Sequence, residues 1–338
     1  MLTDALPPNS RPAELARARG ILAQGGIVAV PTETVYGLAA DATHDRAVAA
    51  IFTAKGRPSF NPLIIHVDGV AMADTYGVLS PLAFALAEAF WPGPLSLVVP
   101  VRKGSGLAAA VTAGLPTVAV RHPKGLMADL VAMLNRPLAA PSANRSGRIS
   151  PTTAAHVARD LGDAVDLILD DGPASVGLES TIVAPQDDGR IQILREGAIT
   201  AAMLAPFGPV EGRFAPTHVE NNASPTSPGQ LLAHYAPSVP LRMAVQEPMD
   251  GEGWLTFGPH KTPSADTKIV TYHLSPTGDL EEAARRLYAG LQVLDTSGVQ
   301  SIGVAPIPDA GIGRAINDRL RRAAHGSTVS TGQTTPYD

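Results

Sequence analysis

Apolar residues between positions 13 and 194 follow two alternating patterns, short continuous runs and longer stretches with helical spacing. Short runs indicate buried strands, and helical spacing indicates helices that bury one face. The runs predict strands at 27–30, 63–67, 95–101, 117–121, 138–140, 166–169, 180–184 and 191–194. The spacing predicts helices at 13–24, 45–54, 81–90, 124–134 and 152–161. Strands interleaved with helices favour an α/β domain built on a mixed sheet.

The periodicity stops between residues 207 and 240, where proline, asparagine and serine recur. So long an unpatterned stretch is unusual inside one compact domain and indicates a linker. A second α/β pattern follows, with strands expected at 241–245, 253–257, 268–271 and 301–305 and helices at 279–294 and 311–324. We therefore expect a first domain at 1–206, a linker or lid at 207–239, a second domain at 240–325 and a disordered tail at 326–338.

Composition narrows the classes of protein that this chain can be. The 338 residues include 26 basic and 31 acidic side chains, a net charge of −5, which argues against a generally basic surface for nucleic acid. There is no cysteine, which excludes disulfides, thiolate nucleophiles and cysteine-based zinc sites. No apolar run reaches the roughly 18 to 20 residues that span a bilayer, so we expect a cytoplasmic protein without a membrane segment.

Two polar segments follow or precede predicted strands and could carry chemistry. P-T-E-T-V-Y-G-L at 31–38 follows a strand, where open α/β sheets bind ligands, although an ordinary polar turn would look similar. K-G-R-P-S-F-N-P at 55–62 places Lys55 and Arg57 on one face if the segment is extended. Two cations on one face suit phosphate oxygens, and the alternative is a solvated basic loop.

Two further segments are candidates. A-P-S-A-N-R-S-G-R-I-S-P-T at 140–152 follows a strand and precedes a helix, so its hydroxyls and backbone N–H groups could surround an anion. The alternative is a capped helix start at Ser150 and Pro151, and Ser142 has no evident base that would make it a nucleophile. The fourth segment combines Ser180, suited to a small polar substrate, with Arg195, suited to a carboxylate or a phosphate.

Several common nucleotide-binding and hydrolytic motifs are missing from the sequence. There is no G-x-x-x-x-G-K-S/T phosphate loop, no G-x-S-x-G elbow and no H-E-x-x-H pair. Gly311 and Gly313 lack the third glycine of a dinucleotide fingerprint. Any nucleotide must therefore be bound by a site that uses none of these motifs.

K-G-R-P at 55–58, P-S-A-N-x-S-G at 141–147 and S-P-T at 150–152 together resemble the YrdC-like family. P-T-E-T-V-Y-G-L and the R-E-G at 195–197 are also habitual segments of that family. S-P-G at 227–229, H-Y-A-P at 234–237 and G-R-A-I-N-D-R-L at 313–320 resemble its two-domain form. The resemblance implies a twisted mixed YrdC-like sheet with helices and a smaller Rossmann-like α/β C-terminal domain.

The resemblance also implies an activity, the joining of L-threonine, bicarbonate and ATP into threonylcarbamoyl-adenylate with release of pyrophosphate. Lys55 and Arg57 would be catalytic. By motif position, the residues that would bind ATP are Lys55, Arg57, Asn61, Thr117, Ser142, Asn144, Ser150, Arg195 and Tyr235. Those that would bind L-threonine are Thr34, His66, Arg121, Ala140 and Ser180, with His66 either a base or only an orienting group.

The implied cofactor is Mg²⁺ carried with ATP, with no organic cofactor and no assigned metal ligands. The implied partners are the tRNA threonylcarbamoyl-transfer machinery, which uses the product to form N6-threonylcarbamoyladenosine; direct tRNA binding is expected to be weak or absent. One departure concerns the linker, where the family often reads S-P-G-M-K-Y-R-H-Y-A-P and this chain reads S-P-G-Q-L-L-A-H-Y-A-P at 227–237. Without the two basic residues, only a tyrosine anchor and a steric lid remain.

Three other classes of protein are worth comparing. An RNA-binding module is disfavoured by the net charge of −5, and salt-dependent tRNA binding without ATP turnover would support it. The hydrogenase-maturation carbamoyltransferases share the domain but carry cysteine-rich zinc fingers, which a chain without cysteine cannot form. A regulator that has lost catalysis is disfavoured by the intact K-G-R-P and P-S-A-N segments.

Overall fold

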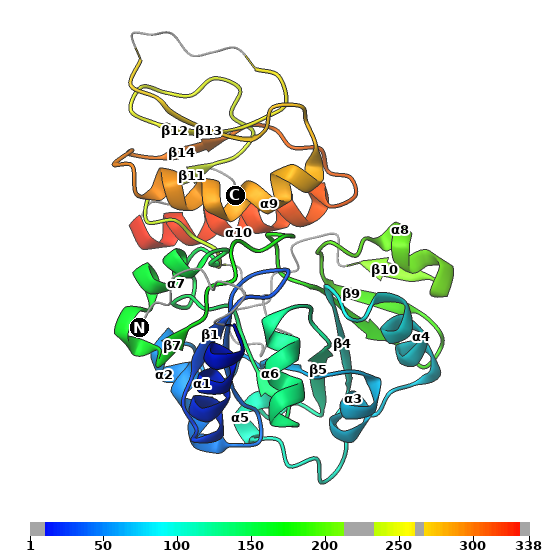
Figure 1. The fold of residues 1–338 in the computed structure, drawn as a ribbon. Helices are drawn as coiled ribbons and strands as arrows, with labels where there is room; N and C mark the ends of the chain where they lie inside the picture. The colour runs from blue at the N-terminus through cyan, green and yellow to red at the C-terminus, as the bar shows by residue number, and fades with distance from the viewer. Residues whose placement is uncertain (1–10, 213–232, 261–266, 332–338) are drawn as a thin grey trace. The chain divides into compact units, whose positions relative to one another are not determined.

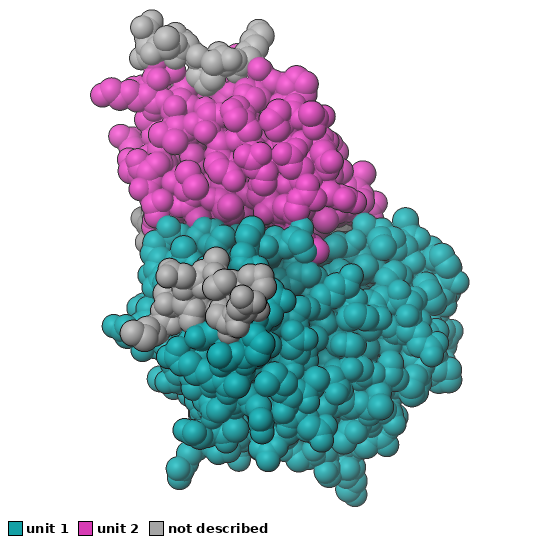
Figure 2. All heavy atoms as spheres, viewed as in Figure 1, with its two compact units in different colours: residues 1–146, 151–175, 179–230 teal, residues 147–150, 176–178, 231–338 magenta. Residues whose placement is uncertain are grey.

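The structure, a computed structural model, describes residues 11–212, 233–260 and 267–331. Contacts divide the chain into two compact units, which are coloured separately in Figure 2. The first unit comprises Met1–Ser146, Pro151–Ser175 and Glu179–Gln230, and the second comprises Gly147–Ser150, Val176–Leu178 and Leu231–Asp338.

The first unit is built on a ten-stranded mixed sheet with the strand order β10-β9-β8-β4-β5-β3-β6-β2-β1-β7. Its strands are β1 (Val28–Val30), β2 (Gly37–Asp41), β3 (Ile64–His66), β4 (Leu95–Pro100), β5 (Thr117–Arg121), β6 (Leu138–Ala139), β7 (Leu167–Ile168), β8 (Thr181–Pro185), β9 (Ile191–Arg195) and β10 (Val210–Gly212). Strands β3 and β5 run parallel, as do β4 and β8, whereas β4 and β5 run antiparallel. The predicted mixed α/β sheet is confirmed.

Helices cover both faces of this sheet (Figure 1). They are α1 (Arg11–Ala23), α2 (Asp45–Lys55), α3 (Val70–Tyr76), α4 (Pro81–Phe90), α5 (Ala109–Thr112), α6 (Leu126–Leu134), α7 (Ala154–Asp160) and α8 (Ala201–Leu204), with the 3-10 turns η1 (Gly162–Ala164) and η2 (Ala205–Phe207). Helices α1 and α6 pack together over β1, β2 and β6, with Leu22 and Leu130 fully buried among them. The opposite face forms the larger core, with Ile51 of α2 and Leu86 of α4 fully buried.

The face of the sheet beneath α1 and α6 is apolar, and it becomes partly polar where it continues onto β3 and β5. Ile64 pairs with Ala119 and His66 with Arg121, and side chains alternate between faces, so all four share this face. Only a small apolar cluster, Ile64, Ala119 and Ile182, is buried there. His66 and Arg121 are also buried, so this part of the sheet presents polar groups where a core would ordinarily lie.

The second unit contains a parallel sheet with the order β11-β14-β12-β13. Its elements are β11 (Leu241–Arg242), β12 (Gly253–Phe257), β13 (Val270–Ser275), α9 (Leu280–Asp295), β14 (Ile302–Val304) and α10 (Gly313–Thr331). Asp279 caps α9 by accepting from the backbone N–H groups of Glu281 and Glu282, and Leu287 is among the residues that the helix buries. A parallel sheet with helices is the expected Rossmann-like α/β architecture.

The structure corrects several element predictions. Val210–Gly212 lies within the expected linker, yet it forms β10 and pairs with β9, while residues 213–232 lie outside the described part of the chain. Helix α10 continues to Thr331, beyond the expected end at Ala324, so the start of the expected disordered tail is helical. Residues 332–338 are not described. The domain limits and the lid therefore stay predictions.

Other elements were not anticipated from the sequence. Strand β2 has the sequence GLAAD, whose glycine and small residues give little strand signal, and α3, α5 and α8 are only four to seven residues long. Within the described residues, none of the helices is both long and apolar enough to cross a membrane.

Candidate active site

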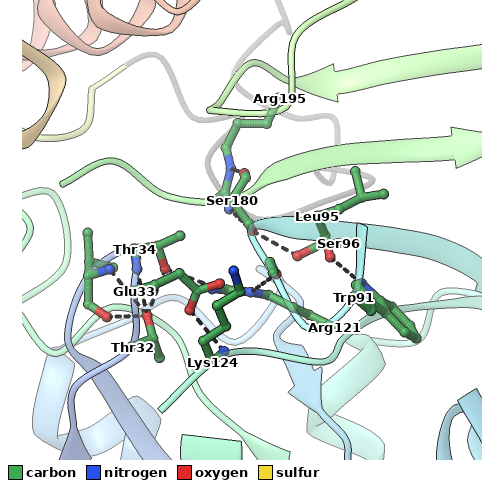
Figure 3. Close-up of polar contacts among 12 residues, drawn as sticks. Thr32, Glu33, Thr34, Trp91, Leu95, Ser96, Arg121, Lys124, Ser180 and Arg195 are labelled. Atoms are coloured by element: carbon green, nitrogen blue, oxygen red, sulfur yellow. Dashed lines mark hydrogen bonds and ion pairs between the residues drawn. The ribbon is translucent and has the colours of Figure 1, made fainter. Parts of the chain in front are cut away.

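The loop after β1 is held together by its own threonine hydroxyls (Figure 3). Thr32 donates its hydroxyl hydrogen to the Val35 carbonyl at 2.7 Å, and the hydroxyls of Thr32 and Thr34 are 2.8 Å apart. Because a hydroxyl has one hydrogen to donate, Thr34 is the donor between them. The oxygen of Thr34 in turn accepts from Arg121 at 2.9 Å. This loop is therefore a preorganised polar surface and not an ordinary solvent-exposed turn.

Arg121 is the centre of this polar cluster. Its Nε donates to the Gly93 carbonyl at 3.1 Å, and its terminal nitrogen forms an ion pair of 2.7 Å with Glu33. The two charged side chains are only 4% and 7% exposed, so the pair is buried. The second oxygen of Glu33 accepts from the backbone N–H of Lys124 at 3.2 Å. A guanidinium has five N–H donors, so Arg121 keeps donor capacity for a carboxylate beyond these contacts.

His66 ends β3 beside Arg121 and is 2% exposed. Burial, followed by the nearby Arg121 charge, lowers the pKa of His66 to about 3, against a hydrogen bond with the Leu138 backbone that raises it. The imidazole is therefore neutral near pH 7. Its Nδ1 has no hydrogen-bond partner within the described residues. Because an unpaired buried polar atom costs about 1–3 kcal/mol, this atom is a natural contact for a bound polar group.

Ser180 precedes β8 and contacts two elements of the sheet. Its hydroxyl lies 2.8 Å from that of Ser96 and accepts from Arg195 at 3.1 Å, while its carbonyl accepts from Arg195 Nε at 3.0 Å. Leu97 pairs with Val120 in antiparallel strands, so Ser96, the residue before Leu97, lies opposite Arg121. The predicted residues Thr34, His66, Arg121 and Ser180 are thus brought onto adjoining strands and one loop.

We expected Lys55 and Arg57 to lie on one extended segment, and the structure shows otherwise. Lys55 is the last residue of α2, and the chain reverses at Gly56, whose φ of 57° is a left-handed conformation that glycine adopts without strain. The buried Lys55 ammonium donates to the carbonyls of Ser142 and Asn144. Burial, and then the Arg57 charge, lowers the pKa of Lys55 well below its usual range. Lys55 thus fastens the loop 142–146 to the end of α2.

Arg57 and Asn61 lie on the turn that follows. Arg57 donates to the carbonyls of Asn61 at 3.4 Å and Pro62 at 2.9 Å. Asn61 is 1% exposed, and neither its amide oxygen nor its amide nitrogen has a partner within the described residues. An amide with both ends buried and unpaired is suited to a ligand that donates and accepts, as a nucleotide base or ribose does.

Backbone contacts tie the long polar loop to the end of α2 and to the start of β2. The Ser146 backbone N–H donates to the Lys55 carbonyl at 2.8 Å, and Ser142 is bridged to Gly37 at the start of β2. Ala140 directly follows β6, whose Leu138 pairs with His66, and Thr117 begins β5 on the face that carries His66. Helix α7 is capped by Thr153, so the alternative in which Ser150 caps this helix is wrong.

Tyr235 and Ser150 fall in the second unit. The Tyr235 ring is 1% exposed, stacks on Tyr288 with centroids 5.7 Å apart, and lies 5.2 Å from the Arg319 guanidinium. Its φ of 63° is unusual for a residue with a bulky side chain. Packing holds Tyr235 in this conformation, and its predicted contact with ATP stays a prediction.

Sequence reasoning missed two residues of this cluster. Glu33 was noted as a carboxylate in the polar loop but not assigned a role, and Ser96 was read only as part of a strand. The signal for Glu33 was a charged residue directly before Thr34, a predicted ligand contact. Ser96 gave no signal, because its partner Ser180 is 84 residues away.

Two family models match the chain. One, for the Sua5, YciO and YrdC proteins and described as telomere recombination, matches residues 20–197. The other, described as the C-terminal domain of threonylcarbamoyl-AMP synthase, matches residues 199–325.

Individual proteins are similar over nearly the whole chain. Threonylcarbamoyl-AMP synthase of Bacillus subtilis (strain 168) is 38% identical over 346 residues, which cover 97% of this chain and 97% of that protein. The Pyrococcus abyssi (strain GE5 / Orsay) protein of that name is 37% identical over 325 residues, covering 91% and 93%. The crystal structure of P. abyssi Sua5 complexed with L-threonine matches with a TM-score of 0.81 and 33% identity, covering 93% of this chain and 95% of that one.

Proposed function

The chain belongs to the threonylcarbamoyl-AMP synthase family, and from this premise we propose how its residues carry out the reaction of that family. The family is enzymatic and forms an AMP-linked product by nucleotidyl transfer. The reaction combines L-threonine, bicarbonate and ATP into L-threonylcarbamoyl-AMP, pyrophosphate and water.

L-Threonine binds at the polar cluster around Arg121. Its carboxylate pairs with the remaining N–H donors of Arg121, which Glu33 and Gly93 hold in a fixed orientation. The buried hydroxyl of Ser180 and the unpaired Nδ1 of His66 are suited to the amine and hydroxyl of the substrate. Thr34 and Ala140 complete the predicted set. The P. abyssi Sua5 complex with L-threonine supports an amino-acid site in this fold.

ATP binds beside this cluster, at the turn after α2 and the loop 142–146. Lys55, Arg57 and the unpaired amide of Asn61 supply the charges and hydrogen-bonding groups that a nucleotide requires. The other predicted ATP contacts are Thr117, Ser142, Asn144, Ser150, Arg195 and Tyr235. Mg²⁺ enters as part of the substrate, because it binds phosphate oxygens and water and needs few protein carboxylates. Among the described residues, there is no group of three or more histidine, aspartate or glutamate side chains that could hold a metal ion.

The chemistry has two steps. The ammonium of threonine and HCO₃⁻ form a carbamate with loss of one water and one proton. A carbamate oxygen then attacks the α-phosphorus of ATP, a new P–O bond forms, and pyrophosphate leaves with the electrons of the broken P–O bond. Attacking and leaving groups are both anionic, so fixed cations provide the main stabilisation of the transition state.

The protein groups act by position and charge in this scheme. Lys55 and Arg57 offset the charge of the triphosphate, and no covalent enzyme intermediate is required. His66 is neutral near pH 7 and its ring N–H is used by the Leu138 backbone, so its unpaired Nδ1 accepts a hydrogen bond from threonine and the ring contributes no positive charge.

The observation that carries this proposal is the buried set of Arg121, Thr34 and Glu33, together with the unpaired buried polar atoms of His66 and Asn61. It is tested by following pyrophosphate release from the full-length protein with ATP, Mg²⁺, bicarbonate and L-threonine. Release should require every component. Pyrophosphate or phosphate release that is indifferent to threonine would contradict the proposal.

The product is expected to feed the tRNA threonylcarbamoyl-transfer machinery, and the cytoplasmic location expected from the sequence stays a prediction. Direct recognition of tRNA by this chain is not favoured, because its net charge of −5 argues against a generally basic surface.

A further inference from the structure

The second unit contains a short stretch of the long polar loop. Gly147–Ser150 belongs to this unit, although the residues on either side of it belong to the first. On the N-terminal side, the first unit holds the chain through Ser146, whose N–H donates to the Lys55 carbonyl at 2.8 Å. On the C-terminal side, Pro151 accepts from Tyr36 at 2.9 Å. The residues that flank Gly147–Ser150 are thus anchored within the first unit, and Gly147–Ser150 itself belongs to the second.

Arg148 and Asp295 make the main polar contact at this stretch. The Arg148 guanidinium pairs with Asp295 at 3.1 Å, and Asp295 also accepts from both the backbone N–H and the hydroxyl of Ser238 at 2.5 Å. The Asp295 side chain is 7% exposed and that of Arg148 is 41% exposed. Beside them, Ala236 donates its N–H to the Gly147 carbonyl at 2.8 Å.

The position of Asp295 in α9 is unfavourable for helix stability. Asp295 is the last residue of α9, where the negative end of the helix dipole disfavours a carboxylate. An aspartate there is expected only if other contacts offset the repulsion, and Arg148 and Ser238 supply them. The C-terminal end of α9 is therefore arranged to hold the loop and the segment around Ala236 together.

A second segment close to the site meets the same helix. The Gly177 backbone approaches α9 so closely that a Cβ there would lie 2.4 Å from the Arg285 Cα. Gly177 precedes Ser180 by three residues. Helix α9 thus holds two backbone segments that each lead into predicted site residues.

We propose that Arg148 and Asp295 are positioning residues, which fix Gly147–Ser150 and through it the polar loop that carries Ser142, Asn144 and Ser150 for ATP binding. The proposal rests on the proposed function, which assigns those three residues to ATP. Because the L-threonine contacts come from the sheet of the first unit and the loop after β1, threonine affinity should not depend on the pair.

The test measures ATP and L-threonine binding separately by titration calorimetry on the full-length chain. Arg148→Met and Asp295→Asn should each weaken ATP binding by about three- to tenfold, less than for a fully buried charged hydrogen bond because Arg148 is partly exposed. The double variant should be no weaker than the weaker single variant, because both changes break one contact. Asp295→Glu should restore part of the affinity.

Glu282→Gln is the matched control, since it removes a carboxylate from the same helix that pairs with Arg286 on its surface. It should leave both affinities unchanged. Unchanged ATP affinity in Arg148→Met, or an equal loss of threonine affinity, would overturn the proposal. If Asp295→Asn does not fold, the ATP affinity of Arg148→Met alone tests the proposal. Failure of the wild-type chain to form an adenylate would refute the proposed function but not the binding result.

Discussion

The buried ion pair between Arg121 and Glu33 allows stability and threonine binding to be separated. Arg121→Met removes the guanidinium and leaves the Glu33 carboxylate, 7% exposed, without its charged partner. Breaking a buried pair from one side typically costs about 3–5 kcal/mol, because the remaining charge stays desolvated. With a urea m-value of about 3 kcal/mol/M, the upper end of the usual range, the unfolding midpoint of the first unit should fall by about 1–2 M.

The double variant Arg121→Met with Glu33→Gln should behave differently. Replacing both charges removes the uncompensated carboxylate, and such double replacements are often close to neutral. The midpoint should therefore return most of the way to the wild-type value. Threonine affinity should not return, because the carboxylate of the substrate has lost a charge-assisted partner that contributes about 1.5–3 kcal/mol, a loss of about tenfold or more.

The assays are urea unfolding followed by circular dichroism and L-threonine titration by calorimetry. A double variant that is stable but does not bind threonine would support both assignments. Wild-type threonine affinity in the double variant would refute the role of Arg121 as the carboxylate partner. Equal instability of the single and double variants would refute the account of the buried pair.

Three further predictions concern the same site. Arg57→Ala should reduce turnover by about 10²- to 10³-fold in a pyrophosphate-release assay, and adding Lys55→Ala should cost less than the product of the single effects, because both cations act on one polyanion; near-normal release would refute the assignment. Burial lowers the pKa of His66 to about 3 and that of His156 to about 4, so both histidines take up protons on unfolding below about pH 6.5. The stability that the two neutral histidines contribute should be fully present above that pH and fall below it by about 1.4 kcal/mol per pH unit for each histidine. His66→Gln should reduce that slope in urea unfolding at about pH 5 and 7, and an unchanged slope would refute the account of its burial. Valine should be a very poor substrate and serine a moderately poor one, because a site that hydrogen-bonds a hydroxyl rejects analogues without it; equal turnover of valine and threonine would show that the pocket is elsewhere.

Local patterns were enough to predict much of the fold. Strand β5, strand β12 and helix α4 have the predicted bounds, since each combines an apolar pattern with clear flanking residues. Strand β2 escaped notice because GLAAD has the residues of a turn and becomes a strand only by pairing with β1 and β6. The strand conformation of β2 therefore depends on pairing with residues that are distant in sequence.

The site could be predicted only in part, for a related reason. The motifs identified Lys55, Arg57 and Arg121, but the sequence could not show what each side chain contacts. Lys55 ends a helix and binds two carbonyls 87 and 89 residues away, which an extended K-G-R-P segment did not suggest. The Glu33 contact with Arg121 likewise joins residues that only the folded sheet brings together.

The central claim is that this chain joins threonine, bicarbonate and ATP into one product, and isotope labelling tests it most directly. The purified chain is incubated with L-threonine, ¹³C-bicarbonate, Mg²⁺ and ATP, and the products are analysed by mass spectrometry. The account predicts threonylcarbamoyl-AMP that carries the ¹³C label, formed in equal amount with pyrophosphate. Conversion of ATP without a labelled adenylate, or an adenylate that forms in the absence of threonine, would contradict it.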